Sequence, residues 1–173
     1  MRRVAGCRLP EELNATTGLM SQQLTADNRT MRIREANPED AEALARLSGQ
    51  LGYPATAEAT ARRLREIIAH QVSAVYVAEM RDRTIAGTAH VLAEYSMMDE
   101  PGAYLAGLIV DESCRSQGIG SALLRAAETW AREHGLTRMR VNSNVIRERA
   151  HRFYLREGYV ENKRQAVFFK PLT

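Results

Sequence analysis

Apolar residues follow two different spacings along the chain, and these separate the predicted helices from the predicted strands. Over residues 41–51 and again over 61–68, apolar side chains recur every three or four positions, as on one face of a helix. Residues 72–80 and 85–97 are instead rich in β-branched and aromatic residues, and a polar turn separates them. This second pattern predicts an antiparallel hairpin.

The rest of the chain from residue 31 onward extends this alternation. Further strands are predicted over residues 31–36, 103–110 and 166–172, and another strand begins with Met139 and Val141. Further helices are predicted over residues 118–134 and 149–157. Asn37 before Pro38 is typical of a helix start, and Gly135 of a helix end. The pattern favours an α/β (α+β) fold, with a mixed central sheet of about six to seven strands and helices on both faces.

Residues 1–30 show no sustained apolar period, so we expect them to form a flexible N-terminal extension. The remaining residues, 31–173, are about the length of one domain. A hydrophobic fraction of 45% and a charged fraction of 26% are ordinary for a globular protein. We therefore expect one folded domain behind a short extension.

Charge and cysteine content narrow the class of partner. The net charge is only +3 and the arginines are scattered, which disfavours nucleic acid as a partner. No apolar stretch is long enough to predict a membrane span. Cys7 and Cys114 lie far apart and no histidines cluster, so neither a disulfide framework nor a metal site is predicted. A reducing cytoplasm fits this composition best.

The most informative segment, residues 110–121, leaves a predicted strand, turns, and opens a long helix with Gly118 and Gly120. Free backbone N–H groups at a helix start, with the positive end of the helix dipole, form a cradle for phosphate oxygens. Arg115 can add a charge-assisted hydrogen bond. Glycines at such a place can also serve only to make a tight turn.

Two other phosphate-binding motifs do not fit this segment. A dinucleotide fingerprint requires a third Gly or Ala where this chain has Leu123, and an acidic residue about 20 positions further on, which is missing here. A nucleotide-hydrolysing P-loop requires Gly-Lys-Ser/Thr, whereas this loop contains no lysine.

The sequence Arg-Ser-Gln-Gly-Ile-Gly at residues 115–120 instead resembles the pyrophosphate-binding Q/R-x-x-G-x-G/A motif of the GNAT superfamily, the GCN5-related N-acetyltransferases. The resemblance extends over residues 31–172 and includes the opening strand at 31–34 and the segment 150–159. That segment, together with residues 143–145, Arg147 and Arg149, is similar to the aminoalkylphosphonate N-acetyltransferases.

The resemblance implies that acetyl-CoA is the cosubstrate and that the strand before the loop is splayed from the next strand. The pantetheine arm would pair with the exposed main chain of Leu108, Ile109 and Val110. The pyrophosphate would be held by the loop, at Arg115, Ser116, Gln117, Gly118, Ile119, Gly120 and Ser121. Asn144, at the end of the second splayed strand, is a further candidate contact to cofactor or substrate, or else caps a local turn.

Acyl transfer to an amine requires a deprotonated nitrogen, a stabilised oxyanion and a protected thiolate. The resemblance gives Tyr154 the role of the acid that faces the sulfur, although the residue could simply pack beside Phe153. Many relatives carry Glu or Asp eight or nine residues before the loop arginine, where this chain has Gly107 and Ala106.

The general base is therefore open. Glu94, Asp99 and Glu100 are candidates acting through water, and each could equally be solvated surface. Cys114 has no adjacent base, so direct transfer is favoured over a covalent enzyme intermediate.

The acceptor is expected to be a primary amine of a small molecule. A protein N-terminus or lysine is the alternative acceptor, and an inactive acyl-CoA-binding module is the alternative from another class. Specificity would come from the predicted helices over residues 49–70 and from the loop over residues 94–102. The family resemblance also suggests a homodimer.

Overall fold

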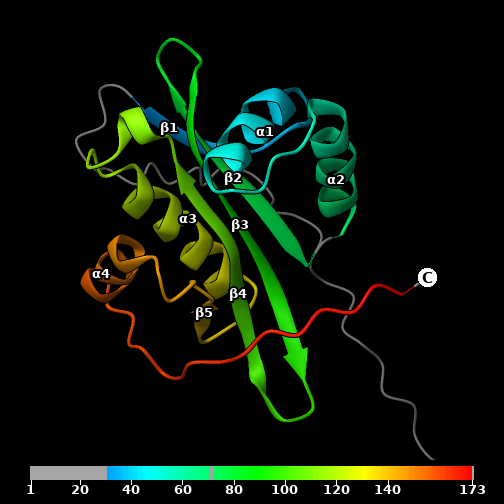
Figure 1. Ribbon diagram of the computed structural model, residues 1–173, viewed down its shortest axis with the longest axis vertical. Helices are drawn as coiled ribbons and strands as arrows, with labels where there is room; N and C mark the ends of the chain where they lie inside the picture. Colours follow the sequence, from blue (N-terminus) through cyan, green and yellow to red (C-terminus); the bar gives the residue numbers. More distant parts are fainter. Residues whose placement is uncertain (1–30, 71, 173) are drawn as a thin grey trace, which may run out of the picture.

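A five-stranded sheet forms the centre of the computed structural model, which describes residues 31–70 and 72–172 (Figure 1). The extension expected over residues 1–30 lies outside the described residues. The strands, in spatial as well as sequence order, are β1 (Met31–Glu35), β2 (Ser73–Met80), β3 (Ile85–Ser96), β4 (Asp99–Val110) and β5 (Met139–Val141). The first four pair antiparallel, and β4 pairs with β5 in parallel, so the predicted mixed sheet is confirmed.

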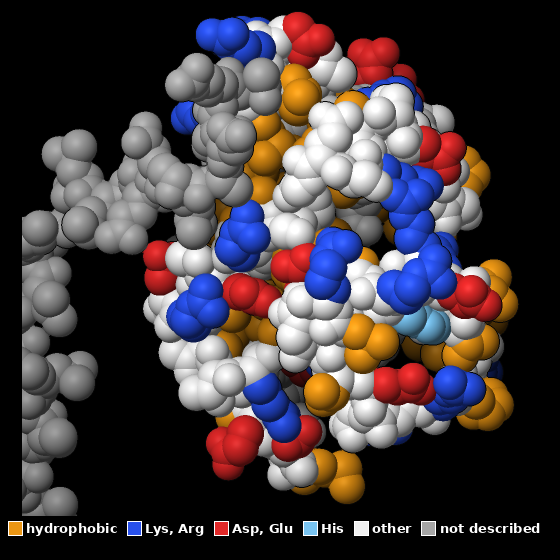
Figure 2. Space-filling model, turned by 90° about the vertical axis from the view of Figure 1, so that its left-hand side faces the viewer, with side chains coloured by type: hydrophobic (Ala, Val, Ile, Leu, Met, Phe, Trp, Pro, Cys, Tyr) orange, Lys and Arg blue, Asp and Glu red, His pale blue; other side chains and the backbone are white. Residues whose placement is uncertain are grey.

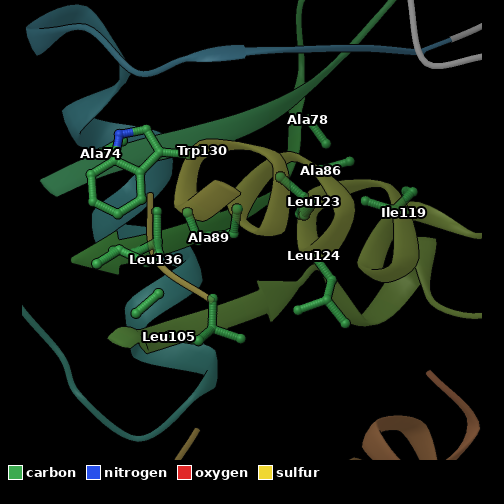
Figure 3. Packing of buried hydrophobic residues seen from close by; sticks show 14 residues of the cluster. Ala74, Ala78, Ala86, Ala89, Leu105, Ile119, Leu123, Leu124, Trp130 and Leu136 are labelled. Atoms are coloured by element: carbon green, nitrogen blue, oxygen red, sulfur yellow. The ribbon is translucent and has the colours of Figure 1, made fainter. Parts of the chain in front are cut away.

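Helices cover both faces of the sheet, as predicted. They are α1 (Ala41–Gln50), α2 (Ala57–Ala69), α3 (Ile119–Glu133) and α4 (Glu148–Arg156). Leu47 of α1 and Leu64 of α2 pack with Val77 of β2 on one face, which we call the α1/α2 face. On the other face the apolar side of α3 packs against Ala89 and Leu105 (Figure 3). Burial of these two apolar surfaces supplies the driving force that holds the three layers together.

Local sequence signals act where they were expected. The Asn37 side chain accepts the Glu39 N–H at 2.9 Å and caps a short 3-10 turn, Pro38–Asp40, that leads into α1. Gly135 ends α3 in the left-handed region, with φ of 70°, where a residue with a Cβ would be strained.

Strands β4 and β5 part soon after they meet. Their pairing covers only Ala103–Leu105 against Met139–Val141, whereas β4 continues to Val110. Among the described residues, the edge of β4 beyond Leu105 therefore has no β5 partner. We call this opening the fork, and it confirms the expected splay.

The prediction of a closing strand over residues 166–172 is wrong, and the sheet has five strands in the described chain rather than six to seven. The segment is rich in strand-forming residues, but a strand also requires a partner for its backbone groups. In the structure Val167, Phe168 and Phe169 are 89%, 93% and 90% exposed. Figure 1 shows the C-terminal segment leaving α4 and ending on the opposite side of the molecule.

Within residues 31–70 and 72–172, no helix is both long and apolar enough to cross a membrane.

Candidate functional site

The loop after β4 is anchored by a buried carboxylate, Asp111. Its side chain accepts the Ser113 N–H at 3.0 Å and the Ser113 hydroxyl at 2.6 Å, which starts a 3-10 turn, Glu112–Cys114. Arg46 of α1 forms an ion pair with the same carboxylate, and Gln50 donates to it at 3.3 Å. These hydrogen bonds, that from Ser113 first and then that from Arg46, hold the pKa of Asp111 well below its usual range. The loop is thus fixed to the α1/α2 face.

Beyond this anchor the backbone turns sharply into α3. Ser116 and Gly118 both have left-handed backbone angles, with φ of 66° and 80°. The space where a Cβ of Gly118 would lie is open. The first N–H to be taken up by the start of the helix is that of Ala122, which donates to the Gly118 carbonyl at 3.0 Å.

The backbone N–H groups from Gln117 to Ser121 consequently find no acceptor among the described residues. Five successive free donors at a helix start, with the helix dipole behind them, can bind an anion. The residues predicted as a phosphate cradle are therefore brought together in the form that this role requires.

Gly120 lies where a side chain would crowd α4. A Cβ at this position would lie 3.3 Å from the Phe153 ring, so the start of α3 can approach α4 closely only without a side chain here. Ser121 is also committed to α4, because its hydroxyl donates to Glu157 at 2.6 Å. Only the backbone N–H of Ser121 is thus available to a ligand.

Arginines surround the loop. Arg115 donates to the Val110 carbonyl at 3.3 Å and pairs with Glu112 at 3.1 Å. Arg149, which the sequence indicated only as part of the family resemblance and not as a binding residue, donates to the Ser116 hydroxyl at 3.2 Å. Figure 2 shows the side of the molecule on which α3 and α4 lie, where Lys and Arg side chains are interspersed with Asp and Glu. The guanidinium groups of Arg115 and Arg149 therefore lie at the loop of the free amides, with Glu112 paired to the first.

Tyr154 of α4 lies close to the fork. Its ring meets Phe153 edge-on at 5.2 Å between centroids and Tyr159 at 5.6 Å. Burial, opposed by Arg147 and reinforced by Tyr104 of β4, raises the pKa of Tyr154 to about 12. Tyr154 packs against the core cluster that contains Leu105, the last residue of β4 that pairs with β5.

The three acidic candidates lie on the β3–β4 hairpin, and two of them form ion pairs with arginines. Glu94 forms a two-point ion pair with Arg140, and Asp99 pairs with Arg138 at 2.6 Å. Hydrogen bonds from these arginines lower the pKa of both carboxyls. Glu100 is exposed near the turn of the hairpin.

Arg140 connects Glu94 to the fork, because its guanidinium lies 4.4 Å from the centre of the Tyr104 ring. Asn144 shapes the turn before α4: its side-chain oxygen accepts the Ile146 N–H at 3.1 Å, and its carbonyl accepts from His151 at 3.0 Å. The exposed Asn144 leaves its amide nitrogen available for other contacts.

Among residues 31–70 and 72–172, no three His, Cys, Asp or Glu side chains come together as a metal site would require.

Comparison with known proteins identifies the class to which this fork and loop belong. The model of the acetyltransferase (GNAT) family matches residues 41–159. The chain belongs to the GNAT family, and it is accordingly an acetyltransferase that uses acetyl-CoA as its cosubstrate.

Two curated relatives are small-molecule N-acetyltransferases by name. The aminoglycoside N(6')-acetyltransferase type 1 of Stenotrophomonas maltophilia is 31% identical over 144 residues, which cover 81% of this chain and 93% of that protein. The aminoalkylphosphonate N-acetyltransferase of Salmonella typhimurium is 47% identical over 55 residues, 32% of this chain and 36% of that protein. The second match agrees with the similarity noted in the sequence.

Solved structures show the same fold. An aminoglycoside N-acetyltransferase in complex with CoA superposes with a TM-score of 0.74 and 22% identity, over 86% of this chain and all of that one. The glucosamine-6-phosphate N-acetyltransferase from Arabidopsis thaliana gives 0.71 and 21%, over 81% of this chain and 98% of its own.

Proposed function

We propose that this enzyme transfers the acetyl group of acetyl-CoA directly to a primary amine of a small polar molecule. The observation that carries the proposal is the row of free amides from Gln117 to Ser121 beside the fork, in a chain that resembles an aminoglycoside N-acetyltransferase over most of its length. Acetyl-CoA supplies the activated acetyl group as a thioester.

The proposed binding residues for acetyl-CoA follow the loop and the open edge of β4. The pyrophosphate is assigned to the amides of Gln117, Gly118, Ile119, Gly120 and Ser121, with Arg115 and Ser116 beside them. The pantetheine arm is assigned to the main chain of Leu108, Ile109 and Val110. We add Arg149, because its hydrogen bond to Ser116 keeps a second guanidinium at the loop. Asn144 stays a candidate contact at the end of β5.

Tyr154 is the proposed partner of the departing sulfur. Its packing against the cluster that contains Leu105, at the paired end of the fork, supports this role. Glu94 and Glu100 stay candidates for carrying the amine proton through water. The ion pair of Glu94 with Arg140 keeps that carboxylate ionised but makes it a weaker base, because its pKa is lowered.

Several large side chains are exposed on the two segments that we expect to determine specificity. Tyr53 follows α1, and Tyr95, Met97 and Met98 lie on the β3–β4 hairpin, where their exposed fractions are 69%, 102% and 94%. This supports residues 49–70 and 94–102 as determinants of specificity.

Release of free CoA thiol from acetyl-CoA over a panel of acceptors tests the proposal. The panel should contain aminoglycosides, aminoalkylphosphonates and amino sugars, set against peptides with free N-termini and lysines. We expect turnover with members of the first group and none with the peptides. Turnover only with peptides would favour a protein acetyltransferase, and tight CoA binding without any turnover would favour an inactive binding module.

We also propose that two copies of the chain associate and that the enzyme works in the cytoplasm. The support for association is the C-terminal segment, since Val167, Phe168 and Phe169 are strand-forming, consecutive and almost fully exposed. The outer edge of β5 has no partner among the described residues. The C-terminal segment of one copy can therefore pair with the outer edge of β5 in a second copy, and a two-fold axis makes the pairing reciprocal.

A further inference from the structure

The imidazole ring of His90, on β3 near the fork, has a nitrogen without a hydrogen-bond partner. The Nε2 atom of His90 is the only buried side-chain nitrogen or oxygen in the described part of the chain that has no hydrogen-bond partner. His90 as a whole is partly exposed, and its Nδ1 atom is not closed off in the same way. Because Nε2 is closed off, Nδ1 is the ring nitrogen through which His90 can take up or release a proton.

The strand register shows which way His90 points. His90 on β3 lies directly opposite Val75 of β2, and residues opposite each other share a face of the sheet. Val75 belongs to the core beneath α1 and α2, so His90 also points to the α1/α2 face. On the other side, His90 lies opposite Gly107 of β4. This places the ring next to the edge of β4 that β5 leaves open.

The backbone of β4 has open space beside it at Gly107. A Cβ built on Gly107 would meet no other atom within 4 Å. The register between β3 and β4 also shifts between His90 and Val91, with Ala106 as the additional residue. Because Ala106 and Gly107 carry no functional side chain, His90 is the nearest titratable group in register with this open space.

We infer that His90 is the general base of the transfer and that the acceptor amine enters over Gly107 on the α1/α2 face. The inference rests on the proposed function. The amine nitrogen forms a bond to the acetyl carbon as the carbon–sulfur bond breaks, and the sulfur leaves as thiolate. The proton that the nitrogen must lose passes to Nδ1 of His90 and then to solvent.

The charges around His90 leave it suited to this role. Burial lowers its pKa, and no charged neighbour contributes to that change, so the ring is neutral and able to accept a proton at pH 7. Two charged groups of neighbouring elements are engaged elsewhere: Glu94 of β3 pairs with Arg140, and Arg46 of α1 pairs with Asp111.

Steady-state kinetics of His90→Gln, with the best acceptor of the amine panel, test the inference. We expect kcat at pH 7 to fall at least tenfold, while calorimetry shows unchanged affinity for CoA. The wild-type kcat should fall as the pH drops below the pKa of His90, which lies below the ordinary 6.5, and the variant should lack this decline. His134→Gln is the matched control, because His134 is exposed at the end of α3, outside the proposed site.

The possible results distinguish a failure of the His90 proposal from a failure of the proposed function. Normal wild-type turnover with an unaffected His90→Gln variant would overturn the role of His90 alone. A decrease in kcat that is the same at every pH would reduce His90 to a structural residue. A wild-type enzyme that binds CoA but acetylates no amine in the panel would overturn both proposals.

Discussion

The hydroxyl of Tyr154 is held where it remains protonated. With its pKa raised to about 12, complete transfer of its proton to a thiolate whose conjugate acid has a pKa of about 8.5 is unfavourable by about 5 kcal/mol. A hydrogen bond to the sulfur carries no such cost and still stabilises the developing negative charge. At the residue scale, we therefore expect Tyr154 to act as a hydrogen-bond donor whose proton moves late or not at all.

Tyr154→Phe should lower kcat at least tenfold without unfolding the protein, because only the hydroxyl is removed and the ring contacts with Phe153 and Tyr159 remain. Thiol-release kinetics and thermal unfolding measure the two effects. Tyr159→Phe is the control, since its hydroxyl donates to Glu128 rather than to the site. An unchanged rate in Tyr154→Phe would remove this residue from the mechanism.

Asp111 governs stability rather than chemistry. Asp111→Asn should destabilise the fold by about 2 kcal/mol at pH 7, because it weakens charge-assisted bonds to Ser113 and Arg46 in a buried position. The folded-state pKa lies below the ordinary value of about 3.9, so this stabilisation is complete above that pH and is lost as the pH falls below it.

Urea unfolding of the wild type and of Asp111→Asn at pH 7 and at pH 3 measures this difference. We expect the gap between the two proteins to be smaller at pH 3. A gap that is equal at both values would contradict the assigned linkage.

At the scale of elements, the loop and α3 combine local and distant requirements. The two strands of the hairpin, the cap at Asn37 and the glycine loop were predictable, because each depends on neighbours in sequence. The contact of Gly120 with Phe153 and the pair of Arg46 with Asp111 were not, since 65 residues separate the latter two. No local pattern records which distant side chain reaches a loop.

Gly118→Ala should weaken CoA binding about tenfold, because a residue with a Cβ costs roughly 1–2 kcal/mol in the left-handed backbone that aims the amides. Gly49→Ala is the control: Gly49 lies within α1 with open space around it, and alanine there should stabilise the helix by up to about 1 kcal/mol. Calorimetry with CoA tests both variants. Equal affinities for wild type and Gly118→Ala would show that the loop backbone does not need this conformation.

At the scale of the whole molecule, the sheet is built so that one edge can receive a ligand. Strands β1 to β4 form a continuous antiparallel ladder, whereas β5 touches β4 only briefly and then leaves it. A parallel strand reached through a helix can diverge from its neighbour, because no tight turn joins the two. The free edge of β4 and the free amides at the start of α3 consequently lie next to each other in the chain.

The exposed C-terminal segment predicts that the sheet is extended at β5 by a second copy of the chain. If Val167, Phe168 and Phe169 pair with β5 of a second copy, replacing both phenylalanines by serine removes the apolar surface that the partner covers. Sedimentation equilibrium should then show a dimeric wild type and a monomeric Phe168→Ser/Phe169→Ser variant. Met97→Ser is the control, because Met97 is equally exposed but lies on the hairpin turn. A monomeric wild type with protected backbone amides over residues 166–172 would instead mean that the segment folds onto its own sheet.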